Sequence, residues 1–178
     1  MGQLGEIYPG GRQRVGFQKP GRSGELRLWI EHLALCASGA EVSHSLFVGR
    51  ADGGTRAVRF RQVSDAASLL EGLVRLYRQG MRDALPFFPK SSRAYAVGYA
   101  SAKSTEDPHH KGCKRAYGEL MPTGFRHTEG EDLYHQLAHD HRLERYVRSD
   151  DRESSAAFAE LALHVFEPLL EHREEVGR

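Results

Sequence analysis

The segment 26–37 constrains the fold more than any other part of the chain, because it is apolar on nearly every side when drawn as a helix. It reads Leu-Arg-Leu-Trp-Ile-Glu-His-Leu-Ala-Leu-Cys-Ala. A helix that is apolar all round is buried in the protein. Gly24 precedes the segment and Ser38-Gly39 follows it, and glycine is common just past a helix end. We therefore expect a buried helix here.

Glycine-rich turns on both sides of this segment predict two β-hairpins. The turn signals are Pro9-Gly10-Gly11 and Asp52-Gly53-Gly54. The flanking strands would be 7–8 with 12–17, and 46–50 with 55–63. Alternation places Val15 and Phe17 on one face of the first hairpin. In the second, Val58 and Phe60 would share one face and the neighbouring arginines the other.

Helical spacing of apolar residues predicts the remaining elements. An amphipathic helix would begin at Ser64 and carry Leu70, Leu73, Val74, Tyr77 and Met81. A second helix, capped by Ser91 or Ser92, would run to about Lys103, and the last would span about 152–171, where Pro168 bends or ends it late. Residues 104–130 read as a long polar loop, and 131–141 as either a strand or a short helix. This order favours one α/β domain over residues 1–178, a sheet covered by helices.

Composition limits the class of protein. The chain has 178 residues, 39% hydrophobic and 28% charged, which is an ordinary globular balance. No apolar run reaches eighteen residues, so we expect no membrane span, and two cysteines are too few for a disulfide framework. A cytoplasmic location is the default expectation. No P-loop is present, so ATP would not bind by that route.

Charge is distributed unevenly along the chain. Residues 1–128 contain 19 Lys and Arg against 11 Asp and Glu, whereas residues 129–178 contain 6 against 13. A basic body could attract phosphates while the acidic end faces away from them. The alternative is a solvated surface with a charged terminal helix.

A metal-dependent nuclease needs carboxylates that hold a divalent cation, usually with a lysine beside them. In the large nuclease fold of restriction enzymes, one strand carries an acid, one further residue and then a lysine. The place in this chain that fits is Phe17-Gln18-Lys19. Phenylalanine cannot bind Mg²⁺ and glutamine is a weak neutral ligand, so the pattern indicates a nuclease strand without its metal site. The acids before residue 30 are Glu6 and Glu25.

Histidines and basic residues are concentrated in the second half of the chain. One group contains His109, His110, Cys113 and His127, and another contains His135, His139 and His141. A structural zinc site normally needs four well-spaced ligands, and no Cys-x-x-Cys pair is present, so we expect no metal. A basic patch with an aromatic residue consists of Lys111, Lys114, Arg115 and Tyr117. Such a patch could bind phosphate and stack a base, or it could belong to a solvated loop.

Three segments together resemble the C-terminal domain of RecC, the gamma subunit of exodeoxyribonuclease V (the RecBCD complex). They are 26–37, 85–96 and 158–170, in matching order and spacing. The most specific piece is the second, which begins Leu-Pro-Phe-Phe-Pro-Lys-Ser-Ser. The resemblance spans roughly residues 5–172.

The resemblance implies a degenerate restriction-endonuclease-like (PD-(D/E)xK nuclease) fold, with a central mixed sheet flanked by helices and without catalytic acids. It implies a subunit domain that assembles with RecB-like and RecD-like partners and acts in DNA strand separation and guidance during recombinational double-strand-break repair, with no cofactor of its own. Trp29, Phe87 and Phe88 are the expected partner contacts. RecC proteins are far longer, so Chi recognition is not assigned to this chain.

Two other function classes stay open. One is an active metal-dependent nuclease that uses Glu6, Glu25 and Glu31 as unusual ligands. The other is a metal-sensing or storage module built on the histidines.

Overall fold

The computed structural model describes residues 4–17, 22–40, 42–51, 53–121 and 127–176. They form two compact units. Unit 1 comprises Met1–Arg78 and Leu169–Arg178, and unit 2 comprises Gln79–Pro168. Whether residues 1–178 behave as a single domain stays a prediction.

Unit 1 is built on a five-stranded sheet in which the strands follow one another in chain order. The strands are β1 (Ile7–Tyr8), β2 (Gly11–Val15), β3 (His44–Ala51), β4 (Gly54–Arg61) and β5 (Arg173–Val176). Neighbouring strands are antiparallel except β2 and β3, which are parallel. The sheet is therefore mixed, as expected. Both predicted hairpins are confirmed, with Gly10 and Gly53 at positive φ in the turns.

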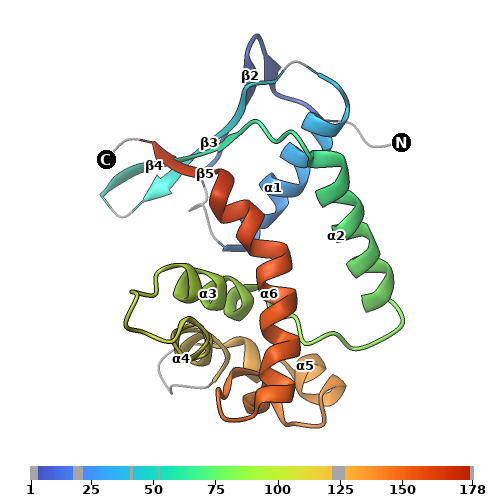
Figure 1. Ribbon diagram of the computed structural model, residues 1–178. Helices are drawn as coiled ribbons and strands as arrows, with labels where there is room; N and C mark the ends of the chain where they lie inside the picture. Colours follow the sequence, from blue (N-terminus) through green and yellow to red (C-terminus); the bar gives the residue numbers. More distant parts are fainter. Residues whose placement is uncertain (1–3, 18–21, 41, 52, 122–126, 177–178) are drawn as a thin grey trace. The chain divides into compact units, whose positions relative to one another are not determined.

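The buried helix predicted from the sequence is α1 (Arg22–Ala37), which connects the parallel strands β2 and β3. Figure 1 shows it on one side of the strands. Trp29 and Leu33 are 1% and 0% exposed, and the Trp29 ring lies 5.4 Å from the Phe60 ring of β4. Because Val58 and Phe60 are both buried, the predicted alternation along β4 is confirmed.

His32 of α1 supplies the polar connection between this helix and the sheet. Its side chain is fully buried, with Nε2 2.8 Å from the Arg61 carbonyl oxygen and Nδ1 2.8 Å from Ser45 Oγ. A carbonyl oxygen only accepts, so Nε2 carries the proton and Nδ1 accepts from the serine. Burial lowers the pKa of His32. The neutral ring thus satisfies its hydrogen bonds inside the core.

Helix α2 (Ala66–Gly80) follows β4 and has the amphipathic pattern expected of it. Within α2, Ala66 is the residue that is buried. Val74 and Tyr77 on the apolar side, with Met81 just beyond the helix, are 41%, 68% and 71% exposed. The periodicity therefore predicted the helix correctly, but not burial of its apolar side.

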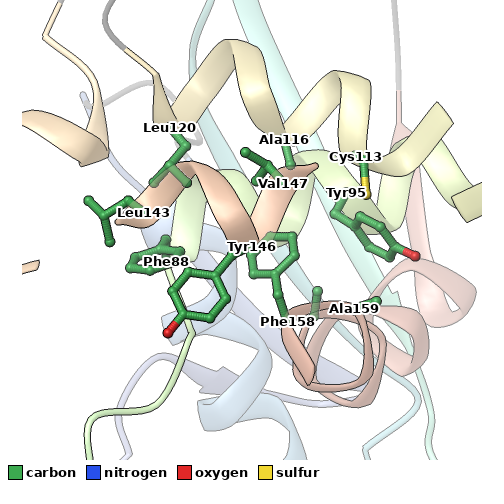
Figure 2. Close-up of a cluster of buried hydrophobic side chains, with 11 residues drawn as sticks. Phe88, Tyr95, Cys113, Ala116, Leu120, Leu143, Tyr146, Val147, Phe158 and Ala159 are labelled. Atoms are coloured by element: carbon green, nitrogen blue, oxygen red, sulfur yellow. The ribbon is translucent and has the colours of Figure 1, made fainter. Parts of the chain in front are cut away.

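Unit 2 is helical. Its elements are α3 (Pro89–Ala100), α4 (Pro108–Leu120), η1 (Glu129–Glu131), α5 (Leu133–Ala138), η2 (Leu143–Val147) and the part of α6 (Arg152–His172) up to Pro168. Its core gathers side chains from α3, α4, η2 and α6 around Phe88 and Phe158, both 0% exposed (Figure 2). Their rings lie 6.2 Å apart. Helix α6 continues past Pro168 to His172, so this proline lies inside the helix.

Helices α3 and α4 pack closely because glycines lie where they meet. A Cβ atom at Gly98 would lie 2.9 Å from the Gly112 Cα, and one at Gly112 would lie 2.6 Å from the Tyr95 ring. Real Cβ atoms essentially never approach so closely. The two glycines therefore allow this helix pair to form.

The N-terminus of α3 differs from its prediction. The helix begins at Pro89, and Ser91 and Ser92 lie inside it. A carboxylate from elsewhere in the chain takes the role expected of these serines. Glu129 accepts hydrogen bonds from the backbone N–H groups of Lys90 and Ser91, at 2.8 and 2.7 Å, and another from the Ser91 hydroxyl. An acid at a helix N-terminus also interacts favourably with the helix dipole.

Among the described residues, no helix is long and apolar enough to cross a membrane.

Candidate functional site

The described part of strand β2 ends before the position at which we expected a degenerate nuclease motif. The strand spans Gly11–Val15, and Phe17 beyond it is 100% exposed. Gln18 and Lys19 lie outside the described residues. The role assigned to Phe17-Gln18-Lys19 therefore stays a prediction, and the structure of the site has to be judged from β2 and the helix packed on it.

Strand β2 directs two arginines towards helix α1. Arg12 is 5% exposed, and its Nη1 donates to Glu31 Oε2 at 2.7 Å while its Nε donates to the Gly5 carbonyl at 3.1 Å. Arg14, two residues along the strand and thus on the same side, places Nη1 3.5 Å from the same carboxylate oxygen. The face of the strand that lies against the helix therefore carries fixed positive charge.

Glu31 is the centre of this cluster, because it faces three guanidinium groups. Arg27, one turn earlier on α1, donates from Nε to Glu31 Oε1 at 3.0 Å. Burial alone would raise the pKa of Glu31, but hydrogen bonds from Arg12 and Arg27 outweigh that effect and lower it. Glu31 is thus a carboxylate already saturated by arginines. We call Arg12, Arg14, Arg27 and Glu31 the arginine cluster.

The other two acids considered as metal ligands are also occupied by arginines. Glu25 is 2% exposed and its Oε1 accepts from Arg173 Nη2 at 3.1 Å. Glu6 Oε2 lies 3.9 Å from both Arg12 and Arg14. Within the described ranges, no three His, Cys, Asp or Glu side chains are grouped so that they could hold a metal ion. A divalent cation placed at the arginine cluster would face guanidinium groups as well as carboxylates, and like charges repel.

The basic patch lies on a helix rather than on the predicted loop. Helix α4 occupies Pro108–Leu120, the centre of the segment read as a polar loop, so that prediction was wrong. Two local signals favour this helix: Asp107 accepts a hydrogen bond from the His109 N–H at 2.9 Å, and Pro108 occupies the first turn. Its buried side is made of small residues and one leucine, at Gly112, Cys113, Ala116 and Leu120.

The helix places the four patch residues outside this buried side. Lys114, Arg115 and Tyr117 are exposed, with Tyr117 at 50%. Lys111 is half-buried, and its Nζ is 2.7 Å from Glu106 Oε2 and 2.8 Å from the Ser101 carbonyl. Lys114 and Arg115 are thus the more available cations, and contact with DNA stays a prediction.

Of the predicted histidine groups, His109, His135 and His139 pack within unit 2, whereas the side chains of His110, His127 and His141 are exposed. His109 places Nδ1 2.8 Å from the Tyr95 hydroxyl and Nε2 3.2 Å from Ser155 Oγ, which connects α3, α4 and α6. His135 and His139 both contact the Phe88 ring edge-on, at 5.0 and 5.4 Å between ring centres, so the expectation that they share a side is confirmed. Segment 131–141 forms the short helix α5 rather than a strand.

The predicted partner contacts differ in their access to solvent. Trp29 is 1% exposed and Phe88 is 0% exposed, so both side chains belong to the cores of their units. Phe87 is partly exposed and its ring stacks 6.1 Å from the Phe166 ring. Partner contact through these segments stays a prediction, and of the three side chains Phe87 offers surface to a partner.

Sequence reasoning did not identify the arginine cluster. One signal was present: Arg12 and Arg14 alternate along a predicted strand. Nothing in the sequence pairs them with Glu31, because 19 positions separate Arg12 from that acid.

Comparison with known proteins supplies the family. A family model described as "RecC C-terminal domain" matches residues 1–100. A search of curated proteins found no match.

Proposed function

The chain belongs to the RecC C-terminal domain family, and we propose that it acts as a non-catalytic, nuclease-like domain of the RecC subunit. RecC is a subunit of the RecBCD complex, which serves DNA repair and recombination. In this proposal the domain binds RecB-like and RecD-like subunits, helps to separate the DNA strands and guides them afterwards. Its fold is a degenerate PD-(D/E)xK nuclease fold, and its location is cytoplasmic.

The observation that carries the proposal is the arginine cluster. A nuclease of this class needs unengaged carboxylates beside the strand that precedes its core helix. In this chain β2 presents Arg12 and Arg14 to α1, and the Glu31 carboxylate is engaged by arginines. The mixed sheet and the helix between its parallel strands support the nuclease-like ancestry. The exposed cations of α4 support DNA contact.

The first test concerns catalysis. The purified chain is incubated with single-stranded and double-stranded DNA in Mg²⁺ or Mn²⁺, and Mn²⁺ binding is measured by calorimetry. We expect neither cleavage nor binding at millimolar metal. Cleavage that disappears in Lys19→Ala would overturn the proposal in favour of an active nuclease. So would Mn²⁺ binding that is lost in Glu31→Gln.

The second test concerns DNA. Fluorescence anisotropy with a single-stranded oligonucleotide compares the wild type with Lys114→Glu/Arg115→Glu at several salt concentrations. The variant should bind more weakly, with a salt slope reduced by about one for each lost phosphate contact. Arg142→Glu/Arg152→Glu makes the same charge change at exposed sites of unit 2 that are not part of α4. Equal weakening by both double variants would exclude a specific role for the patch.

The third test concerns assembly. RecB-like and RecD-like subunits are purified and titrated with the chain, separately and together, and complex formation is followed by light scattering. We expect a stable complex with at least one of them. A chain that stays folded but binds neither subunit would contradict the assembly role.

A further inference from the structure

The two faces of the sheet in unit 1 differ in how they are covered. Several side chains directed towards α1 are buried, among them Ser45, Val58 and Phe60, while Phe47 on the same side is half-buried. The strand register places the alternate residues on the opposite side. We call this side the open face, and its central residues are Val15, Leu46, Val48, Ala57, Arg59 and Arg61. None of these six described residues is buried, and Val15 is 78% exposed.

The open face combines an apolar band with positive charge. Val15, Val48 and Ala57 are direct neighbours across β2, β3 and β4, and Leu46 lies beside Arg59. The Arg59 and Arg61 side chains are 40% and 58% exposed. They share one carboxylate, Glu174 of β5, at 4.0 Å from Arg59 Nη1 and 3.2 Å from Arg61 Nε. Arg59 also has a buried Nε for which the described part of the chain supplies no hydrogen-bond acceptor.

In the residues that the structure describes, the open face lacks the cover that the parallel pair of strands would normally have. Parallel strands connected by a helix are normally covered on both faces, whereas antiparallel strands often leave one face to solvent, so the expectation of a cover applies here to the parallel pair β2 and β3. Here α1 covers one face of the parallel pair β2 and β3, and aliphatic side chains are left partly exposed on the other. An exposed apolar surface bordered by charge is characteristic of a protein contact site.

We infer that the open face docks a protein partner through an amphipathic helix whose apolar side is flanked by acidic residues. The apolar side would pack on Val15, Val48 and Ala57, and the acids would pair with Arg59 and Arg61. Charge complementarity selects this occupant: two arginines share one acid on the sheet, so added carboxylates are attracted and cations are repelled. The inference rests on the proposed assembly function, and the partner is a subunit of the same complex.

Two other occupants fit this face less well. Nucleic acid would find phosphate-binding arginines, but the six central described residues of the face include no aromatic ring on which a base can stack, and the exposed Tyr8 lies at the edge of the sheet. A second copy of the chain would bring one arginine row against another, and like charges across an interface are unfavourable.

The test places a photo-crosslinking amino acid, p-benzoylphenylalanine, at Val48 and exposes the chain to purified RecB-like and RecD-like subunits together with a single-stranded oligonucleotide. Crosslinked peptides are identified by mass spectrometry. We expect Val48 to crosslink to one subunit, within a helical segment that contains acidic residues. Crosslinking to a second copy of the chain, or to a single-stranded oligonucleotide in place of a subunit, would overturn the inference.

Affinity measurements complete the test. Arg59→Glu/Arg61→Glu should weaken binding of that subunit by roughly tenfold or more, because like charges then face each other. Val15→Asp, at a site 78% exposed, should weaken it through the apolar band without unfolding the chain. Arg75→Glu/Arg78→Glu on exposed sites of α2 makes the matched charge change and should alter binding less than twofold. Fluorescence of the buried Trp29 verifies that each variant is folded.

The outcomes separate this inference from the proposed function. If the wild-type chain binds a subunit, but Val48 gives no crosslink and the open-face variants bind like the control, the docking surface is wrong and the assembly role survives. If the wild-type chain binds neither subunit, the assembly role and this docking surface both fail.

Discussion

Replacing Glu31 with glutamine should remove much of the electrostatic stabilisation of unit 1. The substitution keeps the shape of the side chain but leaves Arg12, whose side chain is 6% exposed, without its nearer charged partner, so that Glu6 Oε2 at 3.9 Å remains. Breaking a fully buried pair costs about 3–5 kcal/mol. Glu31 is 15% exposed, and Arg12 keeps its bond to the Gly5 carbonyl, so part of that cost is avoided. We expect a loss of about 2–3 kcal/mol, between the values for buried and surface pairs.

The assay is urea unfolding followed through Trp29, which is the single tryptophan of the chain and is 1% exposed. With a slope of about 2 kcal/mol per molar urea, the midpoint should fall by roughly 1–1.5 M. Glu71→Gln is the matched control, because Glu71 forms an exposed pair with Arg75 on α2 and should cost at most about 0.5 kcal/mol.

Lowering the pH should reduce the difference in the free energy of unfolding between the wild type and Glu31→Gln. Because the pKa of Glu31 is lower in the folded chain than its ordinary value of 4.5, its charged form stabilises the fold above about pH 4.5. That contribution is lost as the pH falls through the folded pKa. Equal midpoints for Glu31→Gln and Glu71→Gln at pH 7 would refute the reasoning, since the cluster would then contribute no more than a surface pair.

Two further predictions concern unit 2. Gly112→Ala should destabilise unit 2 by about 2 kcal/mol or more, because the new Cβ would lie 2.6 Å from the Tyr95 ring. Gly118→Ala on the same helix is the control, because its Cβ would meet nothing within 4 Å, and it should be neutral or stabilising. Urea unfolding followed by far-ultraviolet circular dichroism distinguishes the two variants. Burial, with neighbouring positive charges, lowers the pKa of His139 below 6.5, so the unfolded chain binds a proton more readily and stability should fall as the pH drops below about 6.5. Unfolding measured at pH 7 and 5 should show this loss in the wild type and less of it in His139→Gln; an equal loss in both would contradict the assignment.

Local chemistry was enough to predict the parts of unit 1 that turns and apolar runs define. Gly10 and Gly53 have positive φ, a conformation that glycine adopts without strain, so the hairpins follow from the sequence. The predicted buried helix is α1, because a helix that is apolar on nearly every side is buried in the protein. Strand β5 was missed, because Arg-Glu-Glu-Val lacks a strand pattern and is held by pairing with β4.

In unit 2 the decisive contacts join residues far apart in the chain. Helix α4 was misread as a loop because its buried side is made mainly of glycine, alanine and cysteine, which carry a weak hydrophobic pattern. Glu129 caps α3 across 38 and 39 positions, which no local capping rule anticipates. The packing role of α4 and the capping role of Glu129 can therefore be recognised only in the folded structure.

The sequence by itself determined the order of strands β1 to β4 and helices α1 and α2, the absence of an acid at positions 17 and 18, and the resemblance to a family. Only the tertiary structure decided that Arg12 and Arg14 engage Glu31 and that aliphatic side chains on one face of the sheet are left partly exposed among the described residues. The physical reason is the distance along the chain over which each kind of interaction acts. Turn and helix preferences act over a few neighbouring residues, whereas ion pairing and burial depend on which distant segments the fold brings together.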